Sequence, residues 1–420
     1  MKVVYLNTSD TGGGAAIAGR RILKALEQYH GVEGHMLVQE KNSNEDYITS
    51  IAQTSWQKRL AWGRFVAERL LFLPHERSKE VRFLFNLGQV GTDVSEHPLV
   101  QQADLIHLHW VNFGFQSTST LKKLFALKKP VVWTFHDMWA FTGGCHHSGD
   151  HEGYQQECGY CKFLRNPSPN DISHRRWLAK KDAYAGTPFV AVTCSRWLEG
   201  RARKSSLLQG FRTQTINNPI DTELFAPIPK EQARQQLGLP TNKELVLFAA
   251  MRVNAIGKGF PYFEEALQIL LERHPELHDK VELLVFGQAD QEMVNKLPLR
   301  AHQLGHLSDP MKIALAYNAA SMFVTPSLEE NLPNTIMESF ACGTPVVGFE
   351  VGGIPEMIDH QRNGYLAIYR SAKSIAEGIQ WVLDHNQEGV LSANARQKVL
   401  STYAEKVIAA QYYQLYQSLL

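Results

Sequence analysis

The sequence predicts an α/β protein built from two doubly wound, parallel-sheet domains. Two series of short, β-branched apolar runs alternate with helical patterns along the chain. Strands joined by crossover helices form parallel sheets, so each series predicts one Rossmann-like domain. Residues 217–240, rich in proline and turn formers, separate the two series and are interpreted as the linker. The expected architecture is two such domains facing each other across a cleft.

The expected strands are the apolar runs themselves. In chain order they cover residues 2–7, 35–39, 104–110, 130–137, 188–195, 244–251, 280–287, 321–327 and 345–349. We therefore expect an N-terminal domain over residues 1–216 and a C-terminal domain over 217–400. A last helix over 401–420 is expected to pack back toward the N-terminal domain.

Composition limits the class of protein. The 420 residues are 44% apolar and 20% charged, as in a soluble globular chain with large cores. No run reaches the roughly 20 apolar residues that a membrane span needs. The first seven residues are too short for a secretory signal and predict a buried strand. Five cysteines in such a chain indicate a reducing, cytoplasmic location and favour metal binding or burial over disulfides.

Charge is distributed unevenly along the chain. Residues 1–215 carry 27 Lys and Arg against 19 Asp and Glu, a net +8, and the remainder carries 16 against 23, a net −7. A basic half can attract phosphorylated ligands, an anionic membrane surface or nucleic acid. Because no zinc-finger, helix-turn-helix or RNP pattern is present, nucleic acid is not expected as a partner.

Several unusual loops follow the predicted strands, where open α/β sheets bind ligands. Gly12, Gly13 and Gly14 leave backbone amides accessible to phosphate, although their spacing does not fit G-x-G-x-x-G and an ordinary tight turn would explain them too. Arg252 and Lys258 flank a glycine-bearing loop and suit a diphosphate, or else are simply solvated. His136 ends a strand, where a satisfied core histidine is the alternative.

Two carboxylates, Glu330 and Glu338, lie eight positions apart around Asn-Leu-Pro-Asn-Thr. Proline is tolerated in the first turn of a helix, so we expect a helix that begins near Pro333. Glu330 then lies in the preceding loop and Glu338 on the second turn. The unpaired amides at the helix start would form an anion site between them. The alternative is that Glu330 only caps this helix.

Residues 143–161 form the most individual loop of the chain. A tetrahedral Cys3His zinc site is predicted here, with a C-x-x-C knuckle. Its expected ligands are Cys145, His151, Cys158 and Cys161, with His146 or His147 as substitutes for His151. Reduced cysteines in an ordinary loop are the alternative.

Residues 55–85 mix aromatic and aliphatic side chains with basic ones. Such a segment could be an interfacial helix that docks on anionic lipid, as in a peripheral membrane protein. An ordinary helix with a solvated basic face would show the same composition.

This ordered series of features resembles the GT4 family of retaining glycosyltransferases, which have the GT-B fold. The resemblance covers nearly the whole chain and includes "TFHDMW", "SRWLEGRARKS", "NNPIDTELFAP", the Arg-x5-Lys-Gly of "RVNAIGKG" and the E-x7-E element followed by "ACGTPVVGFEVGGIPEMI". The zinc loop is similar to that of the colanic-acid branch of the family, which often has a cysteine in place of His151. The resemblance therefore favours a structural zinc.

The resemblance also implies roles for the loops. The C-terminal domain would bind a nucleotide-sugar donor such as a UDP- or GDP-sugar, and the N-terminal domain the acceptor. Arg252 and Lys258 would bind the diphosphate, Glu338 the ribose and Glu330 the sugar ring. His136 would reach the donor sugar. The further donor-binding residues would be Gly13, Gly14, Asn331, Leu332, Pro333 and Asn334.

The implied activity is that of a hexosyltransferase of exopolysaccharide, lipopolysaccharide or capsule biosynthesis. The chain has no Asp-x-Asp pair for a metal-bridged diphosphate, so catalysis is expected to need no metal. The acceptor would be an oligosaccharide or lipid-linked glycan on the cytoplasmic face of the inner membrane. A sugar-nucleotide enzyme such as a UDP-sugar 2-epimerase, or a catalytically silent glycan-binding protein, is the alternative.

Overall fold

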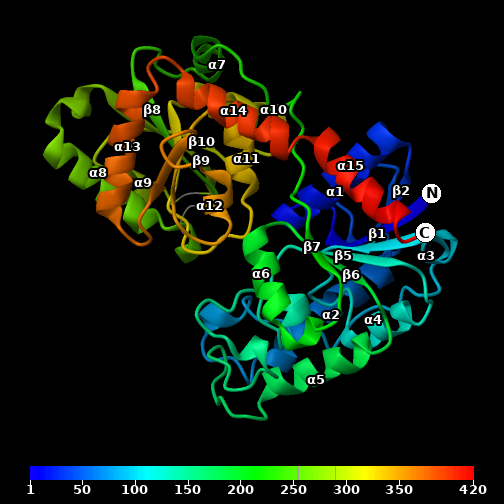
Figure 1. The fold of residues 1–420 in the computed structure, drawn as a ribbon. Coiled ribbons are helices and arrows are strands. Elements are labelled where there is room, and N and C mark those ends of the chain that lie inside the picture. Colours follow the sequence, from blue (N-terminus) through cyan, green and yellow to red (C-terminus); the bar gives the residue numbers. More distant parts are fainter. Residues whose placement is uncertain (253–254, 289) are drawn as a thin grey trace. The chain divides into compact units, whose positions relative to one another are not determined.

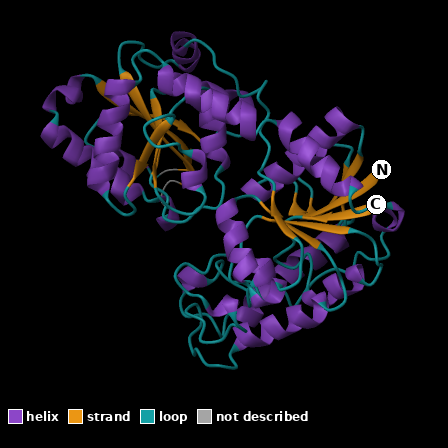
Figure 2. Ribbon diagram, viewed as in Figure 1, coloured by secondary structure: helices purple, strands orange, loops and turns teal. Residues whose placement is uncertain are grey.

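The computed structural model describes residues 1–252, 255–288 and 290–420 of the chain. They divide into two compact units, one made of Met1–Asn218 with Ile408–Leu420 and the other of Pro219–Val407. Figure 2 shows that each unit is a layer of strands between helices. The predicted fold class is confirmed, because both sheets are parallel throughout and both are doubly wound.

The N-terminal unit contains a seven-stranded sheet in the order β3-β2-β1-β4-β5-β6-β7. Its strands are β1 (Lys2–Ser9), β2 (Glu33–Glu40), β3 (Ile48–Ser50), β4 (Leu105–Leu108), β5 (Val131–Phe135), β6 (Val190–Thr193) and β7 (Thr213–Thr215). Its helices are α1 (Gly14–His30), α2 (Ser55–Phe72), α3 (Pro98–Gln102), α4 (Thr118–Phe125), α5 (Ile172–Tyr184), α6 (Arg196–Lys204) and α15 (Glu405–Gln417). The strand order reverses between β1 and β4, where a doubly wound sheet binds its ligand.

Each face of this sheet has its own apolar core. Side chains of α1 and α15 pack on one face, for example Leu23 and Tyr412, and side chains of α3, α4, α5 and α6 pack on the other, for example Leu121 and Leu198. Successive residues of a strand point to opposite faces, so β1 contributes Tyr5 to the first core and Leu6 to the second. The strands are therefore buried on both sides, as the continuous apolar runs in the sequence indicate.

A buried polar network connects the last helix to this sheet. His107 of β4 contacts the Tyr416 hydroxyl through Nδ1 at 2.6 Å and the Thr134 hydroxyl through Nε2 at 2.7 Å. The Tyr412 hydroxyl lies 2.9 Å from that of Thr134, and Tyr416 donates to the Tyr5 hydroxyl at 3.4 Å. Burial lowers the pKa of His107 well below its usual value, so the imidazole is neutral and has one donor and one acceptor nitrogen. One proton order is consistent with all four contacts.

The C-terminal unit contains a six-stranded sheet in the order β10-β9-β8-β11-β12-β13. Its strands are β8 (Glu244–Arg252), β9 (Val281–Gln288), β10 (Ala301–Gly305), β11 (Met322–Thr325), β12 (Val346–Phe349) and β13 (Gly364–Ala367). Its helices are α7 (Lys230–Leu237), α8 (Phe260–Arg273), α9 (Gln291–Asn295), α10 (Pro310–Ala319), α11 (Asn334–Ala341), α12 (Ile354–Met357), α13 (Ala372–His385) and α14 (Val390–Thr402). The order reverses between β8 and β11, which brings the loops that follow these two strands together.

Helices cover both faces of this second sheet as well (Figure 1). α8 and α13 share a core with alternate residues of β8, such as Val246 and Phe248. On the opposite side, Tyr317 of α10 packs edge-on against Phe323 of β11, and α11 contacts both α10 and α14. Buried Ile336 and Phe340 place one side of α11 in this packing, which fixes the axis of the helix beside β12.

The strand predictions are correct for the centre of each sheet and incomplete at its edges. All nine predicted runs form strands, whereas β3, β7, β10 and β13 were not expected. These four are the outermost strands of the two sheets. Edge strands are short and partly exposed, so they lack the continuous apolar run that marks a central parallel strand. The predicted linker over 217–240 contains α7, which packs on α10.

Among the residues described, none of the helices combines the length and the apolar character that crossing a membrane would require.

The network around His107 makes a prediction about stability. Tyr416→Phe removes the hydroxyl that pairs with buried His107 Nδ1, so we expect the free energy of unfolding to fall by about 1–3 kcal/mol. The midpoint of urea unfolding measures this change. The matched control is Tyr413→Phe on the same helix, at a ring that stacks on His30. Equal midpoints for the two variants would show that the network does not stabilise the unit.

Candidate active site

The loop after β1 leads directly into the first helix of the N-terminal unit. Gly12 has φ = 81°, a conformation that favours glycine, and Gly13 is the N-cap of α1. The space beside both residues is open, because a Cβ on either would meet no atom within 4 Å. The first turn of α1, which begins at Gly14, has no acidic side chain to neutralise its positive end. The predicted ligand loop is therefore open where an anion would approach.

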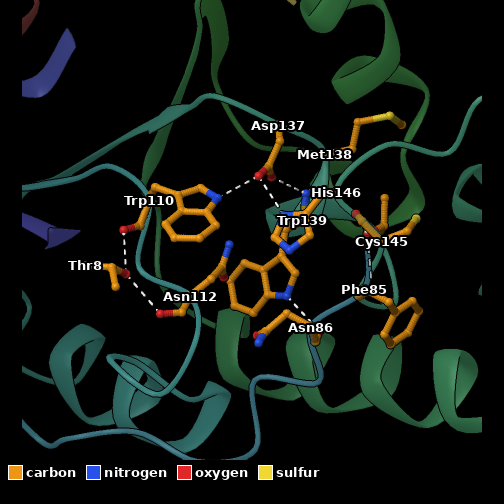
Figure 3. Close-up of polar contacts among 12 residues, drawn as sticks. Thr8, Phe85, Asn86, Trp110, Asn112, Asp137, Met138, Trp139, Cys145 and His146 are labelled. Atoms are coloured by element: carbon orange, nitrogen blue, oxygen red, sulfur yellow. Dashed lines mark hydrogen bonds and ion pairs between the residues drawn. The ribbon is translucent and has the colours of Figure 1, made fainter. Parts of the chain in front are cut away.

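A carboxylate organises the loops after β4 and β5. Asp137 accepts hydrogen bonds at 2.7 Å from the Trp110 indole and from His146 Nδ1, and at 2.8 Å from the Trp139 backbone N–H. Figure 3 shows the indole and the imidazole directed at this carboxylate from two sides. Burial opposes ionisation of Asp137, but His146, His147 and the Trp139 N–H together outweigh it and the pKa is lowered to about 2. The carboxylate is therefore ionised and joins the two strand ends.

The neighbouring backbone is also held by side chains. The Thr8 hydroxyl, at the end of β1, donates to the carbonyl oxygens of Trp110 at 3.0 Å and Asn112 at 2.9 Å. This contact fixes the loop after β4 to β1 and so holds the Trp110 ring beside Asp137 (Figure 3). None of these partners was expected from the sequence. Polar residues that directly follow buried strands, as in "HLHW" and "FHDMW", are the signal that could have found them.

His136 is the strand-end histidine predicted as a site residue. It is partly buried after β5, with Nε2 3.1 Å from His109 Nδ1 and Nδ1 3.4 Å from Cys194 Sγ. The His109 ring in turn lies 4.2 Å from the ring of His107. Burial lowers the pKa of His136 to about 4, although the Asp137 charge opposes the shift. His136 is therefore a neutral imidazole near pH 7, able to donate or accept one hydrogen bond at each nitrogen.

In the C-terminal unit, the loops after β8 and β11 bring two of the predicted residues together. Lys258 Nζ forms an ion pair with Glu330 Oε1. The glutamate side chain is 16% exposed and the lysine side chain 39% exposed. The pair therefore lies at the surface of the unit, where a ligand can reach the ammonium group.

Two glycines determine where the backbone of Glu330 lies. A Cβ at Gly352, which has φ = 59° and follows β12, would overlap the Glu330 carbonyl oxygen. A Cβ at Gly259, which has φ = 69° and follows β8, would overlap the Pro326 carbonyl oxygen. Hydrogen bonds add to this packing, from Leu328 N to Gly257 O at 2.8 Å and from Gly353 N to Glu330 O at 3.2 Å. The loop after β11 is therefore held from both sides by the backbone of Gly259 and Gly352. Any other residue at these two positions would be too large for so close an approach.

The helix after this loop begins as the sequence predicts. α11 starts at Asn334 with Pro333 as its N-cap, and Glu338 lies on its second turn, 8% exposed. Asn331 and Leu332, before the helix, are also buried. Pro333 makes no side-chain cap hydrogen bond, and the Glu330 carboxylate pairs with Lys258. The predicted role of Arg252 concerns a side chain that lies outside the described residues.

The zinc prediction is not supported by the structure. Its four expected ligands line one cavity of about 10 Å³, but the described part of the chain contains no group of three or more His, Cys, Asp or Glu arranged to hold a metal ion. Burial raises the pKa of the Cys145, Cys158 and Cys161 thiols, the last two strongly. The Cys158 sulfur accepts the Gly143 N–H at 3.1 Å. Of the suggested substitutes for His151, His146 pairs with Asp137.

Comparison with known proteins finds a family model that matches the C-terminal unit. The family model described as "Glycosyl transferases group 1" matches residues 229–406. Among curated proteins, a D-inositol 3-phosphate glycosyltransferase of Catenulispora acidiphila is 32% identical over 48% of this chain. The chain spans about half the length of that relative. An uncharacterised glycosyltransferase of Methanocaldococcus jannaschii is 29% identical over 96% of this chain and 94% of its own.

A third relative is described as a putative colanic acid biosynthesis glycosyl transferase, WcaC of Escherichia coli. It is 24% identical over 77% of each chain.

Solved structures resemble the whole chain in fold. Sucrose-phosphate synthase from Thermosynechococcus elongatus has a TM-score of 0.67 and 19% identity, covering 100% of this chain and 98% of its own. HepE of Anabaena in complex with UDP has a TM-score of 0.65 and 18% identity, with both chains covered fully. WaaG, a lipopolysaccharide glycosyltransferase, has a TM-score of 0.62 and 16% identity, covering 98% of this chain and 99% of its own. The C-terminal unit therefore belongs to the group 1 glycosyltransferases, and the chain as a whole has the GT-B fold.

Proposed function

We propose that this chain is a retaining, metal-independent glycosyltransferase that moves a sugar from a nucleoside-diphosphate donor to a lipid-linked surface polysaccharide. The observation that carries the proposal is the Lys258–Glu330 pair in the loops before the start of α11, with Glu338 on the next helical turn. The complexes of HepE with UDP and with UDP-glucose support a nucleotide-sugar donor. The descriptions of WcaC and WaaG support a surface polysaccharide as product.

The first part of the proposal is charge stabilisation of the leaving group. When the glycosidic bond breaks, negative charge grows on the departing nucleoside diphosphate. Lys258 supplies a cation, Arg252 is proposed as a second, and the backbone N–H groups at the start of α11 add partial positive charge. Before the donor binds, Glu330 compensates the Lys258 charge and orients the ammonium group. Donor binding then exchanges part of this contact for one with phosphate.

The second part concerns the sugar and the nucleoside. Glu330 is proposed to face the sugar ring, where positive charge develops as the bond to the phosphate breaks. Glu338 is proposed to bind the ribose, which does not change during the reaction. The remaining donor contacts are assigned to Asn331, Leu332, Pro333 and Asn334 in the same segment, and to Gly13 and Gly14 at the open start of α1.

The proposed reaction forms the new bond on the same face of the sugar as the bond that breaks. The acceptor hydroxyl attacks the anomeric carbon, its proton passes to the leaving phosphate, and the nucleoside diphosphate departs. His136 is proposed to assist at the sugar as a hydrogen-bonding partner, in exchange for its contact with His109 or Cys194. Its low pKa means that it would act as a neutral imidazole and would not add a positive charge beside the developing one.

Donor binding is the first test of this proposal. A ligand at about 100 times its Kd stabilises the folded state by about 2.7 kcal/mol, so one sugar nucleotide from a panel of UDP-, GDP-, ADP- and TDP-sugars should raise Tm clearly. Lys258→Met should abolish most of that shift, whereas Lys312→Met, at an exposed lysine of α10, should keep it. If no sugar nucleotide shifts Tm in the wild-type chain, the donor assignment is wrong.

The two glutamates should respond differently to substitution. Glu338→Gln should raise the donor KM more than it lowers kcat, because contacts to the ribose stabilise ground and transition states alike. Glu330→Gln should lower kcat by about a hundredfold, because a carboxylate beside the sugar is most effective in the transition state. Steady-state kinetics of both variants measure the difference. A Glu330→Gln enzyme with nearly normal kcat would contradict the catalytic role.

Backbone packing at Gly352 should also be required for turnover. Gly352→Ala places a methyl group where the Glu330 carbonyl oxygen lies, so the loop must shift and kcat should fall by about a hundredfold. Gly343→Ala is the matched control, since Gly343 also has positive φ (76°) but its nearest contact to an added Cβ is 3.6 Å. Both variants carry the backbone cost of alanine at positive φ. Equal loss of kcat in the two variants would show that general strain, and not displacement of Glu330, is responsible.

A further inference from the structure

Helix α2 exposes several large apolar side chains, although its inward side also buries the apolar residues Ala61 and Phe72. At 100° per residue, Trp56, Leu60, Leu70 and Leu71 fall on one side, and all four are exposed. Trp62 and Leu73 lie about a third of a turn away from Trp56, on the flank of the helix nearest Arg69, and are exposed too. The two tryptophans are 65% and 68% exposed. We call these six residues, together with exposed Phe83 and Leu84 of the following segment, the α2 surface.

The opposite side of α2 carries the buried charges. Glu68 accepts the backbone N–H groups of Gln89 at 2.5 Å and Val90 at 2.6 Å. Arg69 donates to the carbonyl oxygens of Arg82 at 2.5 Å and Phe85 at 3.3 Å. These inward contacts, together with the buried Ala61 and Phe72, fix which side of the helix faces the unit. The apolar side chains on the other side therefore have no core to enter, and exposed apolar side chains gathered on one element mark an interaction surface.

The charges around the α2 surface are of one sign. Lys58 and Arg59 are exposed on the first turns of the helix, beside Trp56 and Trp62. Between residues 53 and 75 the sequence has a single acidic residue, Glu68, which is fully buried. Exposed tryptophans next to basic side chains suit the boundary between lipid headgroups and acyl chains of an anionic bilayer. A second copy of this chain fits less well, because a symmetric contact would place these cations against each other.

The α2 surface adjoins the strand ends of the candidate site. The backbone of Arg64 and Phe65 packs directly on Gly114, whose Cβ would lie 2.9 Å from it. The Phe65 ring is 6.0 Å from that of Phe113, and the Phe113 ring is 5.0 Å from the Trp110 indole. Phe83 of the α2 surface has its ring 6.2 Å from that of Phe113, so the Phe113 ring alone connects this surface to Trp110 in the series of ring contacts.

We propose that the α2 surface docks on anionic lipid bilayers, with Trp56 and Trp62 in the interface and Lys58 and Arg59 at the headgroups. The biological purpose of this docking rests on the proposed function, because docking would bring the N-terminal unit to an acceptor carried by lipid. The binding itself requires no sugar nucleotide and no acceptor.

Co-sedimentation of the full chain with vesicles tests the proposal. The protein should bind vesicles of phosphatidylcholine mixed with phosphatidylglycerol at low salt, and should be released as salt rises. Pure phosphatidylcholine vesicles should bind it at least about tenfold more weakly, because each basic side chain contributes about 1 kcal/mol only at an anionic surface. Equal binding to the two kinds of vesicle would overturn the proposal.

Substitutions then locate the contact. Trp56→Ala with Trp62→Ala, and separately Lys58→Gln with Arg59→Gln, should each weaken binding about tenfold or more. The matched control is Leu178→Ala with Lys181→Gln, an exposed apolar and basic pair on α5, which should bind as the wild type does. Binding of the tryptophan variant equal to that of the wild type would overturn the assignment.

Two further measurements distinguish lipid docking from misfolding of the variants and from self-association of the chain. Each variant should keep the wild-type Tm shift with its sugar nucleotide, which shows that it is folded and that failure of docking is distinct from failure of the proposed function. Sedimentation velocity without vesicles should give the same species for wild type and variants. A wild-type dimer that the tryptophan variant loses would identify a second copy as the occupant and overturn the lipid proposal.

Discussion

The candidate donor site depends on close backbone contact at two glycines. Gly259 and Gly352 bring the loops after β8 and β12 against the main chain between Pro326 and Glu330, so the loop after β11 is held from both sides. The parallel sheet makes this possible, because β8, β11 and β12 are neighbours and end at the same edge. The Glu330 carboxylate belongs to this loop, and α11 begins a few residues after it. Their geometry is therefore set by main-chain packing, and side-chain hydrogen bonds such as the Lys258 contact add to it.

The two units offer different electrostatic environments at their strand ends. In the C-terminal unit a cation and a carboxylate pair at a partly exposed surface, where phosphate can compete for the cation. In the N-terminal unit an ionised Asp137 is enclosed by its donors, and the adjacent row of His136, His109 and His107 is neutral through burial. The first arrangement is suited to exchange of charged partners. The second keeps fixed protonation states, which suits recognition of neutral hydroxyl groups.

The sequence predicted those features that local pattern determines. Apolar runs located the central strands, and Pro333 located the start of α11, which placed Glu338 on its second turn. The pairing of Lys258 with Glu330 was not predicted, because it depends on which strands are neighbours, and the roles of Gly259 and Gly352 depend on contacts distant in sequence. For the same reason ligand spacing in residues 143–161 suggested a zinc site, whereas the fold buries these thiols around a small cavity without arranging them for a metal. Composition showed the basic, aromatic character of α2, but only the buried positions of Glu68 and Arg69 show which side faces outward.

The return of α15 to the first sheet has a consequence for how the chain folds during synthesis. His107 and Thr134 are made early, but Tyr416, which pairs with His107, follows it by 309 residues, and Tyr412, which pairs with Thr134, follows that threonine by 278 residues. The N-terminal unit is therefore discontinuous in sequence, and the C-terminal unit is inserted between its parts. A growing chain exposes all of Pro219–Val407 before the segment that closes the first unit has left the ribosome. The order usual for multidomain proteins, in which the N-terminal domain is finished first, is thus reversed for the last step, and synthesis of α15 is what completes the N-terminal core.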